Sequence, residues 1–145
     1  MPEIRRNALI PYSPAQMYAL VDDVVSYPQF LPWCVAAKEW SRSVDEVWAA
    51  IALRSGALHK EFTTHNRLQQ DKMIEMRLVE GPFSCLEGFW RFEALGEESC
   101  KVSLDLEYEF TSRLLKMAVG PVFNQIANTL VDAFCARAVE IYGKR

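Results

Sequence analysis

The sequence has few of the residues from which catalytic and metal sites are usually built. It contains two histidines, His59 and His65, and both fall in the same predicted strand. At about 3.3 Å per residue they lie roughly 20 Å apart, so they cannot share one metal ion or act on one bond. Alternation with apolar residues predicts that both are solvated on the outer face of a sheet. Three neighbours share that predicted face: Glu61, Thr63 and Arg67.

Glycine and cysteine are sparse as well. The six glycines are scattered and form no phosphate-binding loop, which argues against nucleotide chemistry. The four cysteines lack the paired spacing of a zinc site or a redox dithiol, so we expect reduced core thiols: Cys34, Cys85, Cys100 and Cys135. The acidic residues of the last strand alternate outward into water, where acid-base catalysis is unfavourable. We therefore expect no catalytic residues, no metal, no cofactor and no enzyme activity.

Long apolar runs and a strong charge of one sign are also missing. No apolar run approaches the ~20 residues of a membrane-spanning helix, and the first residues are too polar for a secretory leader, so we expect a cytoplasmic protein. The net charge of -3 gives no general attraction to phosphate, and DNA is not an expected partner. The last segment is nevertheless net basic, which leaves a local anionic contact open. Its cations are Arg113, Lys116, Arg137, Lys144 and Arg145.

Half of the residues are hydrophobic, and the pattern predicts a single α+β domain over residues 1–145. Residues 4–10 read as a strand, and Ser13, Pro14 and Gln16 have the spacing of a helix N-terminus with a capping box. Its apolar residues recur at helical spacing as far as Val25. Residues 26–34 combine three large rings with two prolines and predict a stiff apolar connector.

Residues 35–110 switch to a period of two, interrupted by five turn signals, and predict six consecutive strands. After residue 112 the apolar spacing becomes helical again. Gly120 and Pro121 predict a break between a short helix at 113–119 and a long one at 121–142. One sheet of about seven strands, curved around the long helix, would bury a single face. Gly88, inside a strand, predicts a bend or a close approach by another group.

Several segments together resemble a known family: YPQFLPWC at 27–34, FTT at 62–64, EGPF at 80–83 and WRF at 90–92. They are similar to the coenzyme Q-binding family of the START-like, polyketide cyclase superfamily, over nearly the whole chain. The resemblance implies a helix-grip fold with a hydrophobic tunnel. It also implies one of two unrelated functions, which both stay open at this point.

The first implied function is non-enzymatic binding or carriage of ubiquinone, in support of respiration, with a peripheral contact at the inner membrane. The second is that of a ribosome-association toxin, which binds the large ribosomal subunit and blocks its joining with the small one. The acidic net charge favours the first, and the basic last segment keeps the second open. A polyketide cyclase-like enzyme ranks third, because the inward positions offer little besides Tyr108 and thiols.

For the carrier function we expect an isoprenoid quinone, or another apolar small molecule, between the sheet and the long helix. Periodicity cannot distinguish a cavity from a solid core, so the solid core remains the alternative. The expected ligand-binding residues are Phe30, Trp33, Met76, Leu78, Phe83, Trp90, Tyr108, Phe110, Val122, Phe123, Ile126 and Leu130. The predicted helix break would either free residues 113–119 to act as a lid or merely let the helix follow the sheet.

Overall fold

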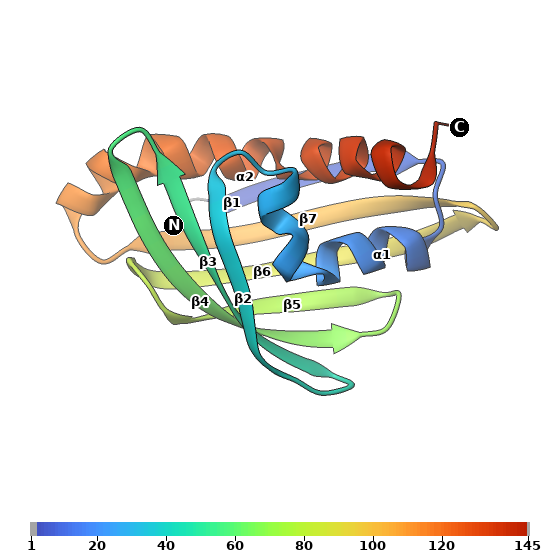
Figure 1. Cartoon of the computed structure of the whole chain (residues 1–145), viewed down its shortest axis with the longest axis horizontal. Helices are drawn as coiled ribbons and strands as arrows, with labels where there is room; N and C mark the ends of the chain where they lie inside the picture. The colour runs from blue at the N-terminus through green and yellow to red at the C-terminus, as the bar shows by residue number, and fades with distance from the viewer. Residues whose placement is uncertain (1–2, 145) are drawn as a thin grey trace.

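The computed structural model describes residues 3–144, which form an antiparallel sheet crossed by a long helix (Figure 1). The strands are β1 (Glu3–Ile10), β2 (Cys34–Arg42), β3 (Glu46–Ser55), β4 (Leu58–Gln69), β5 (Met73–Glu80), β6 (Phe83–Gly96) and β7 (Ser99–Phe110). The helices are α1 (Pro14–Asp22), the 3-10 helix η1 (Val24–Gln29) and α2 (Arg113–Tyr142). The predicted α+β class and order of elements are confirmed.

Within residues 3–144 the sheet has seven strands, in the order β1-β7-β6-β5-β4-β3-β2. Register shifts interrupt the pairing of β2 with β3, of β4 with β5 and of β6 with β7. Such bulges bend strands and increase their twist. In Figure 1, β2, β3 and β4 turn up toward α2, while α2 runs along β1 and β7. This arrangement is the expected helix-grip fold.

The start of α1 follows the predicted capping box. The Gln16 backbone N–H donates to the Ser13 hydroxyl at 3.2 Å, and the Ser13 N–H donates to the Gln16 side chain at 2.9 Å. The helix ends earlier than the apolar spacing suggested, because Asp23 leaves helical geometry and the chain continues in η1. The Tyr27 hydroxyl donates to the Val21 carbonyl, which satisfies one acceptor that a longer helix would have used.

The predicted break in the terminal helix is wrong, because α2 is continuous from Arg113 to Tyr142. Pro121 lacks the N–H of a regular helix turn, yet Val119 and Phe123 are buried on either side of it. Packing on the sheet therefore holds both turns in one helix. Without a break, the basis for a lid at residues 113–119 disappears.

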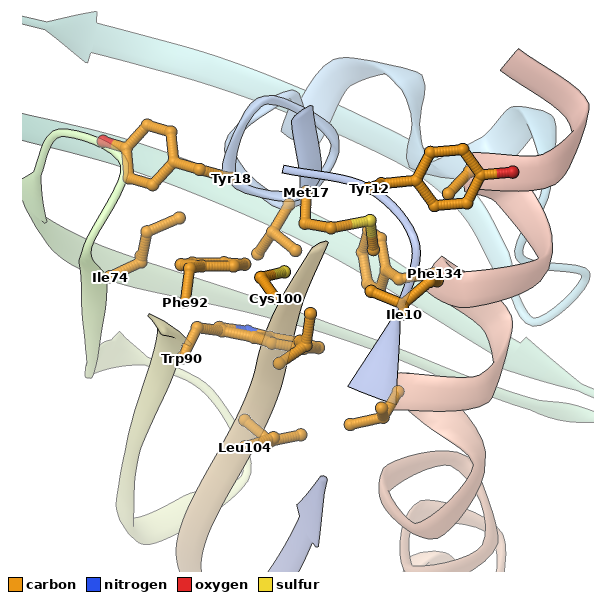
Figure 2. Close-up of a cluster of buried hydrophobic side chains, with 14 of the residues drawn as sticks. Ile10, Tyr12, Met17, Tyr18, Ile74, Trp90, Phe92, Cys100, Leu104 and Phe134 are labelled. Atoms are coloured by element: carbon orange, nitrogen blue, oxygen red, sulfur yellow. The ribbon is translucent and has the colours of Figure 1, made fainter. Parts of the chain in front are cut away.

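Two clusters of buried side chains fill the space between the sheet and the helices. In the first, the Phe134 ring of α2 lies 5.2 Å from Trp90 and 5.4 Å from Tyr27, measured between ring centroids. Figure 2 shows Phe134 beside Trp90, with Met17 of α1 closing the cluster from the other side. The second cluster surrounds Phe83 and Phe123, whose centroids are 4.9 Å apart. The α2 helix connects the two clusters.

The two histidines lie on β4, as expected, but in different surroundings. His59 is exposed. His65 is half-buried, with its ring stacked on Trp48 at 4.2 Å and its Nε2 atom 3.3 Å from Glu46. Thr63, expected on the solvated face, is buried where the register of β4 and β5 shifts. The bulge explains this difference, because a local shift changes which side chains the neighbouring strand covers.

Candidate functional site

A cavity of about 80 Å³ lies between the sheet and α2 and is bounded by residues of both core clusters. Its size follows from β3 and β4, which bring small residues to one wall. Ala49 of β3 lies opposite Thr64 of β4 in the pairing register, and both line the cavity. The rest of the lining is almost entirely apolar or aromatic. A hollow interior is therefore present, although it is narrow.

Half of the expected ligand-binding residues line this cavity. They come from the connector, from the middle of the sheet and from α2: Trp33, Met76, Trp90, Phe123, Ile126 and Leu130. The α2 members repeat at spacings of three and four residues, so one face of the helix forms one wall. Whether these side chains bind a ligand remains a prediction.

The other expected residues lie outside the cavity and pack the core around it. Phe30 stacks edge-on against Phe134 at 5.2 Å. The others belong to the second cluster or pack against it: Leu78, Phe83, Tyr108, Phe110 and Val122. The sequence analysis predicted these residues as ligand-binding because their side chains face the interior of the fold. In the structure, neighbouring rings pack against them and separate them from the cavity. Phe83, for example, is 4.9 Å from both Phe110 and Phe123.

The sequence analysis missed the contribution of β3 and β4 to the cavity. The missed residues are Ala49, Ile51, Leu53, Phe62, Thr64 and Asn66. Alternation along β4 could have found the last three, since they share the parity of Leu68. Asn66 is 6% exposed and Thr64 is 8% exposed. Both were overlooked because polar residues in a strand are normally assigned to the solvated face.

Gly88 marks a close approach, as predicted. A Cβ atom at this position would lie 2.8 Å from the Met76 Cε atom and 2.9 Å from the Leu106 Cδ1 atom. Met76 and Leu106 both line the cavity. The glycine thus makes room for the side chains that narrow the hollow, instead of for a ligand directly.

The polar groups near the cavity are poorly suited to catalysis. The Tyr108 hydroxyl donates to the Asn124 side chain at 2.9 Å, and burial raises the pKa of Tyr108. Burial also raises the pKa of Cys34 and of Cys100 to about 11, so neither thiol forms a nucleophilic thiolate at neutral pH. Among residues 3–144 no cluster of potential ligands could hold a metal ion, and no helix could cross a membrane.

The curved sheet, the long helix that it grips and the apolar cavity together define a class of ligand-binding and cyclase-like proteins. Residues 10–135 match the family described as "Polyketide cyclase / dehydrase and lipid transport". The chain belongs to this family. Its members include enzymes as well as binding proteins, so membership alone does not decide between the two.

Particular relatives are more specific. The chain is 46% identical to the ribosome association toxin RatA of Pseudomonas aeruginosa, over 97% of each chain. It is 44% identical to the ribosome association toxin RatA of Escherichia coli K12, over 100% of this chain and 92% of the relative. A more distant relative is the mitochondrial coenzyme Q-binding protein COQ10 homolog B of Xenopus laevis, 24% identical over 99% of this chain and 60% of the relative.

Solved structures agree with the fold. An 18 kDa protein of Caulobacter crescentus superposes with a TM-score of 0.76 and 31% identity, over 99% of this chain and 100% of the other. The Zhui aromatase/cyclase of Streptomyces sp. R1128 superposes with a TM-score of 0.78 over 94% of this chain and 93% of the other. At 14% identity, the second likeness concerns the fold alone.

Proposed function

We propose that this protein associates with the ribosome, without catalysing a reaction, by binding the large subunit and keeping the small subunit from joining it. One observation carries the proposal: identity of 44–46% along essentially the whole chain to proteins named as ribosome association toxins. The cavity size supports it indirectly. A volume of about 80 Å³ is far below the roughly 300–1,000 Å³ of typical ligand pockets, and an isoprenoid quinone needs more space.

The ribosome contact needs exposed cations, and the structure changes which ones are available. Arg137 was grouped with the basic last segment, but its side chain is only 14% exposed. It donates to Gln29 at 2.8 Å and lies 5.0 Å above the Phe30 ring, so it holds the connector against α2. Lys144 is exposed, and Arg145 lies outside the described residues. The basic segment is therefore not one surface.

The first turns of α2 offer a better contact surface. Arg113 and Lys116 are exposed there, and none of the ion pairs among residues 3–144 involves them. Two large apolar side chains lie beside them, Leu114 at 78% exposure and Met117 at 71%. Cations among exposed apolar side chains suit a surface that presents phosphate and base edges together. We therefore propose that the ribosome contact is made by Arg113, Leu114, Lys116 and Met117. We call these four residues, in the first turns of α2, the α2 entry surface.

Cosedimentation with purified ribosomal subunits tests the proposal. We expect binding to the large subunit that weakens as salt rises, because phosphate contacts release counterions. Replacing Arg113→Gln together with Lys116→Gln should weaken binding and lower the slope of log affinity against log salt by about two. Arg77→Gln together with Arg91→Gln is the matched control, since it also removes two cations, which are already paired with Glu75 at 3.4 Å and with Asp105 at 2.7 Å.

Two results would contradict the proposal. Failure to sediment with the large subunit at low salt would rule out ribosome association. Equal loss of binding in the control and in the α2 variant would remove the α2 entry surface from the contact, because net charge alone would then explain the effect.

A second candidate function rests on the cavity. Its apolar lining and the distant likeness to a coenzyme Q-binding protein support the binding of an apolar small molecule, with a peripheral membrane contact for its delivery. The expected ligand-binding residues that line this cavity are Trp33, Met76, Trp90, Phe123, Ile126 and Leu130. Extraction of protein purified from its host, followed by mass spectrometry, should recover such a molecule in near-stoichiometric amount. Recovery of phospholipid alone, or of nothing, would contradict this candidate.

A further inference from the structure

A buried amide faces the cavity from the middle of β4. Asn66 is 6% exposed and lines the cavity, and its Oδ1 atom has no hydrogen-bond partner among residues 3–144. Its neighbours in the pairing register are Val47 of β3 and Met76 of β5, which offer no polar side-chain atom able to bond it. Buried polar groups are almost always paired, so an unpaired one at a cavity wall points to a partner supplied from outside the chain.

A second polar group lies beside it. Thr64 precedes Asn66 by two residues, so both side chains project from the same face of β4, about 7 Å apart. Thr64 also lines the cavity, and its neighbour across β3 is Ala49. The short side chain of Ala49 leaves space in front of the hydroxyl. Together Thr64 and Asn66 form a polar strip in an otherwise apolar wall.

The size and charge of the cavity limit what can occupy it. Its volume of about 80 Å³ is below the ~150 Å³ of a cavity that accepts benzene. Met76 lines it with an unbranched, flexible side chain, and its rotation would enlarge the cavity toward the volume that one ring needs. No cation or carboxylate among residues 3–144 lines it, so a charged occupant would lose hydration without compensation.

We propose that the cavity binds a compact neutral amphiphile with an apolar body of about one ring and one hydroxyl group, and that this hydroxyl hydrogen-bonds to Asn66 beside Thr64. A hydroxyl both donates and accepts, so it suits either end of the Asn66 amide. The inference rests on the second candidate function, that the cavity holds a ligand, and is independent of ribosome association.

Phenol and toluene are matched probes, because they have nearly the same shape and differ in a hydroxyl against a methyl group. Titration of the purified protein, followed by NMR of its amide groups, gives a dissociation constant for each. In an apolar cavity toluene binds more tightly, since the phenol hydroxyl loses its bonds to water. Here we expect phenol to bind about tenfold more tightly than toluene, the effect of one net hydrogen bond.

Three variants test whether the polar strip of Thr64 and Asn66 causes the preference for phenol over toluene. Asn66→Leu replaces the amide with an apolar group of similar size and should remove the preference for phenol while toluene still binds. Thr64→Val keeps the shape of the side chain and should reduce the preference without abolishing it. Ala49→Leu fills the space opposite and should abolish binding of both probes, which locates them in this cavity.

The outcomes separate this inference from the function on which it rests. Equal or weaker binding of phenol by the unmodified protein would overturn the inference and leave an apolar ligand site standing. A preference for phenol that persists in Asn66→Leu would overturn it as well. Saturable binding of neither probe would overturn the inference and the candidate ligand-binding function together.

Discussion

At the scale of single residues, the segments that resemble the family have separate structural tasks. In the connector, Tyr27 and Phe30 pack on Phe134, and Tyr27 and Trp33 also line the cavity. In the EGPF segment, Gly81 has a φ of 158° and a Cβ there would lie 2.6 Å from the Phe62 Cβ atom. Only glycine fits this contact. These motifs therefore build the core and also part of the cavity wall, to which they contribute Tyr27, Trp33, Phe62, Thr64 and Trp90.

Gly88 provides a test at the same scale. In Gly88→Ala the added methyl group meets the ends of the Met76 and Leu106 side chains, which must turn toward the cavity. We expect the free energy of unfolding to fall by about 1–2 kcal/mol, the usual cost of overpacking. Urea denaturation measures it. A variant as stable as the unmodified protein would show that the cavity absorbs the displaced side chains without strain.

At the scale of elements, α2 decides both the core and the proposed contact surface. Its buried face connects the two core clusters, while its first turns carry the α2 entry surface. Arg113 and Arg137 are about 36 Å apart along a regular helix, so the cations at the two ends cannot act as one patch. Arg137 stabilises the connector instead.

Because α2 is continuous, Gly120 lies inside a helix instead of at a hinge. A Cβ at Gly120 would have its nearest neighbours at 3.8 Å, the Lys116 Cγ and Phe110 Cε2 atoms, which is ordinary contact. Alanine has the higher helix propensity, by about 1 kcal/mol, but in helical geometry the Pro121 Cδ atom crowds a Cβ on the residue before it. We therefore expect Gly120→Ala to change the free energy of unfolding by less than about 1 kcal/mol. Thermal unfolding followed by circular dichroism measures it, with Gly88→Ala as the matched glycine variant that should lose about 1–2 kcal/mol. A loss of stability in Gly120→Ala as large as that in Gly88→Ala would contradict this expectation.

At the scale of the whole molecule, buried thiols couple folding to pH. Burial raises the pKa of Cys34 and Cys100 from the ordinary 9.0 to about 11. Below about pH 8 both thiols are protonated whether the chain is folded or unfolded, and they add no pH dependence. Between pH 9 and 11 the unfolded chain releases protons that the folded chain retains. Stability is therefore lost as pH rises through this window.

We expect the free energy of unfolding to fall between pH 9 and 11 by up to about 1.4 kcal/mol per pH unit for each of these thiols. Urea denaturation at a series of pH values measures this dependence. The Cys34→Ala and Cys100→Ala double variant should show a shallower decline, because neither alanine titrates. An equal slope in both proteins would assign the decline to other groups, such as Tyr18, whose pKa is raised to about 12.

The sequence by itself determined the order of the elements, the seven strands, the capped start of α1 and the inward faces of most strands. These features depend on local chemistry: a capping box, turn residues and alternation are all visible within a few residues. The family resemblance came from short motifs in the same way. Where a local signal misled, as at Gly120 and Pro121, packing on the sheet overrode an intrinsic preference for a break.

Only the tertiary structure decided which inward side chains face a hollow and which fill the core. Phe83 and Trp90 are both buried and both inward, yet Trp90 lines the cavity while neighbouring rings surround Phe83. The burial of Asn66 depends in the same way on strands from distant parts of the sequence. A cavity is the space that non-neighbouring side chains leave unfilled, and periodicity along one strand reports the direction of a side chain but not what it meets.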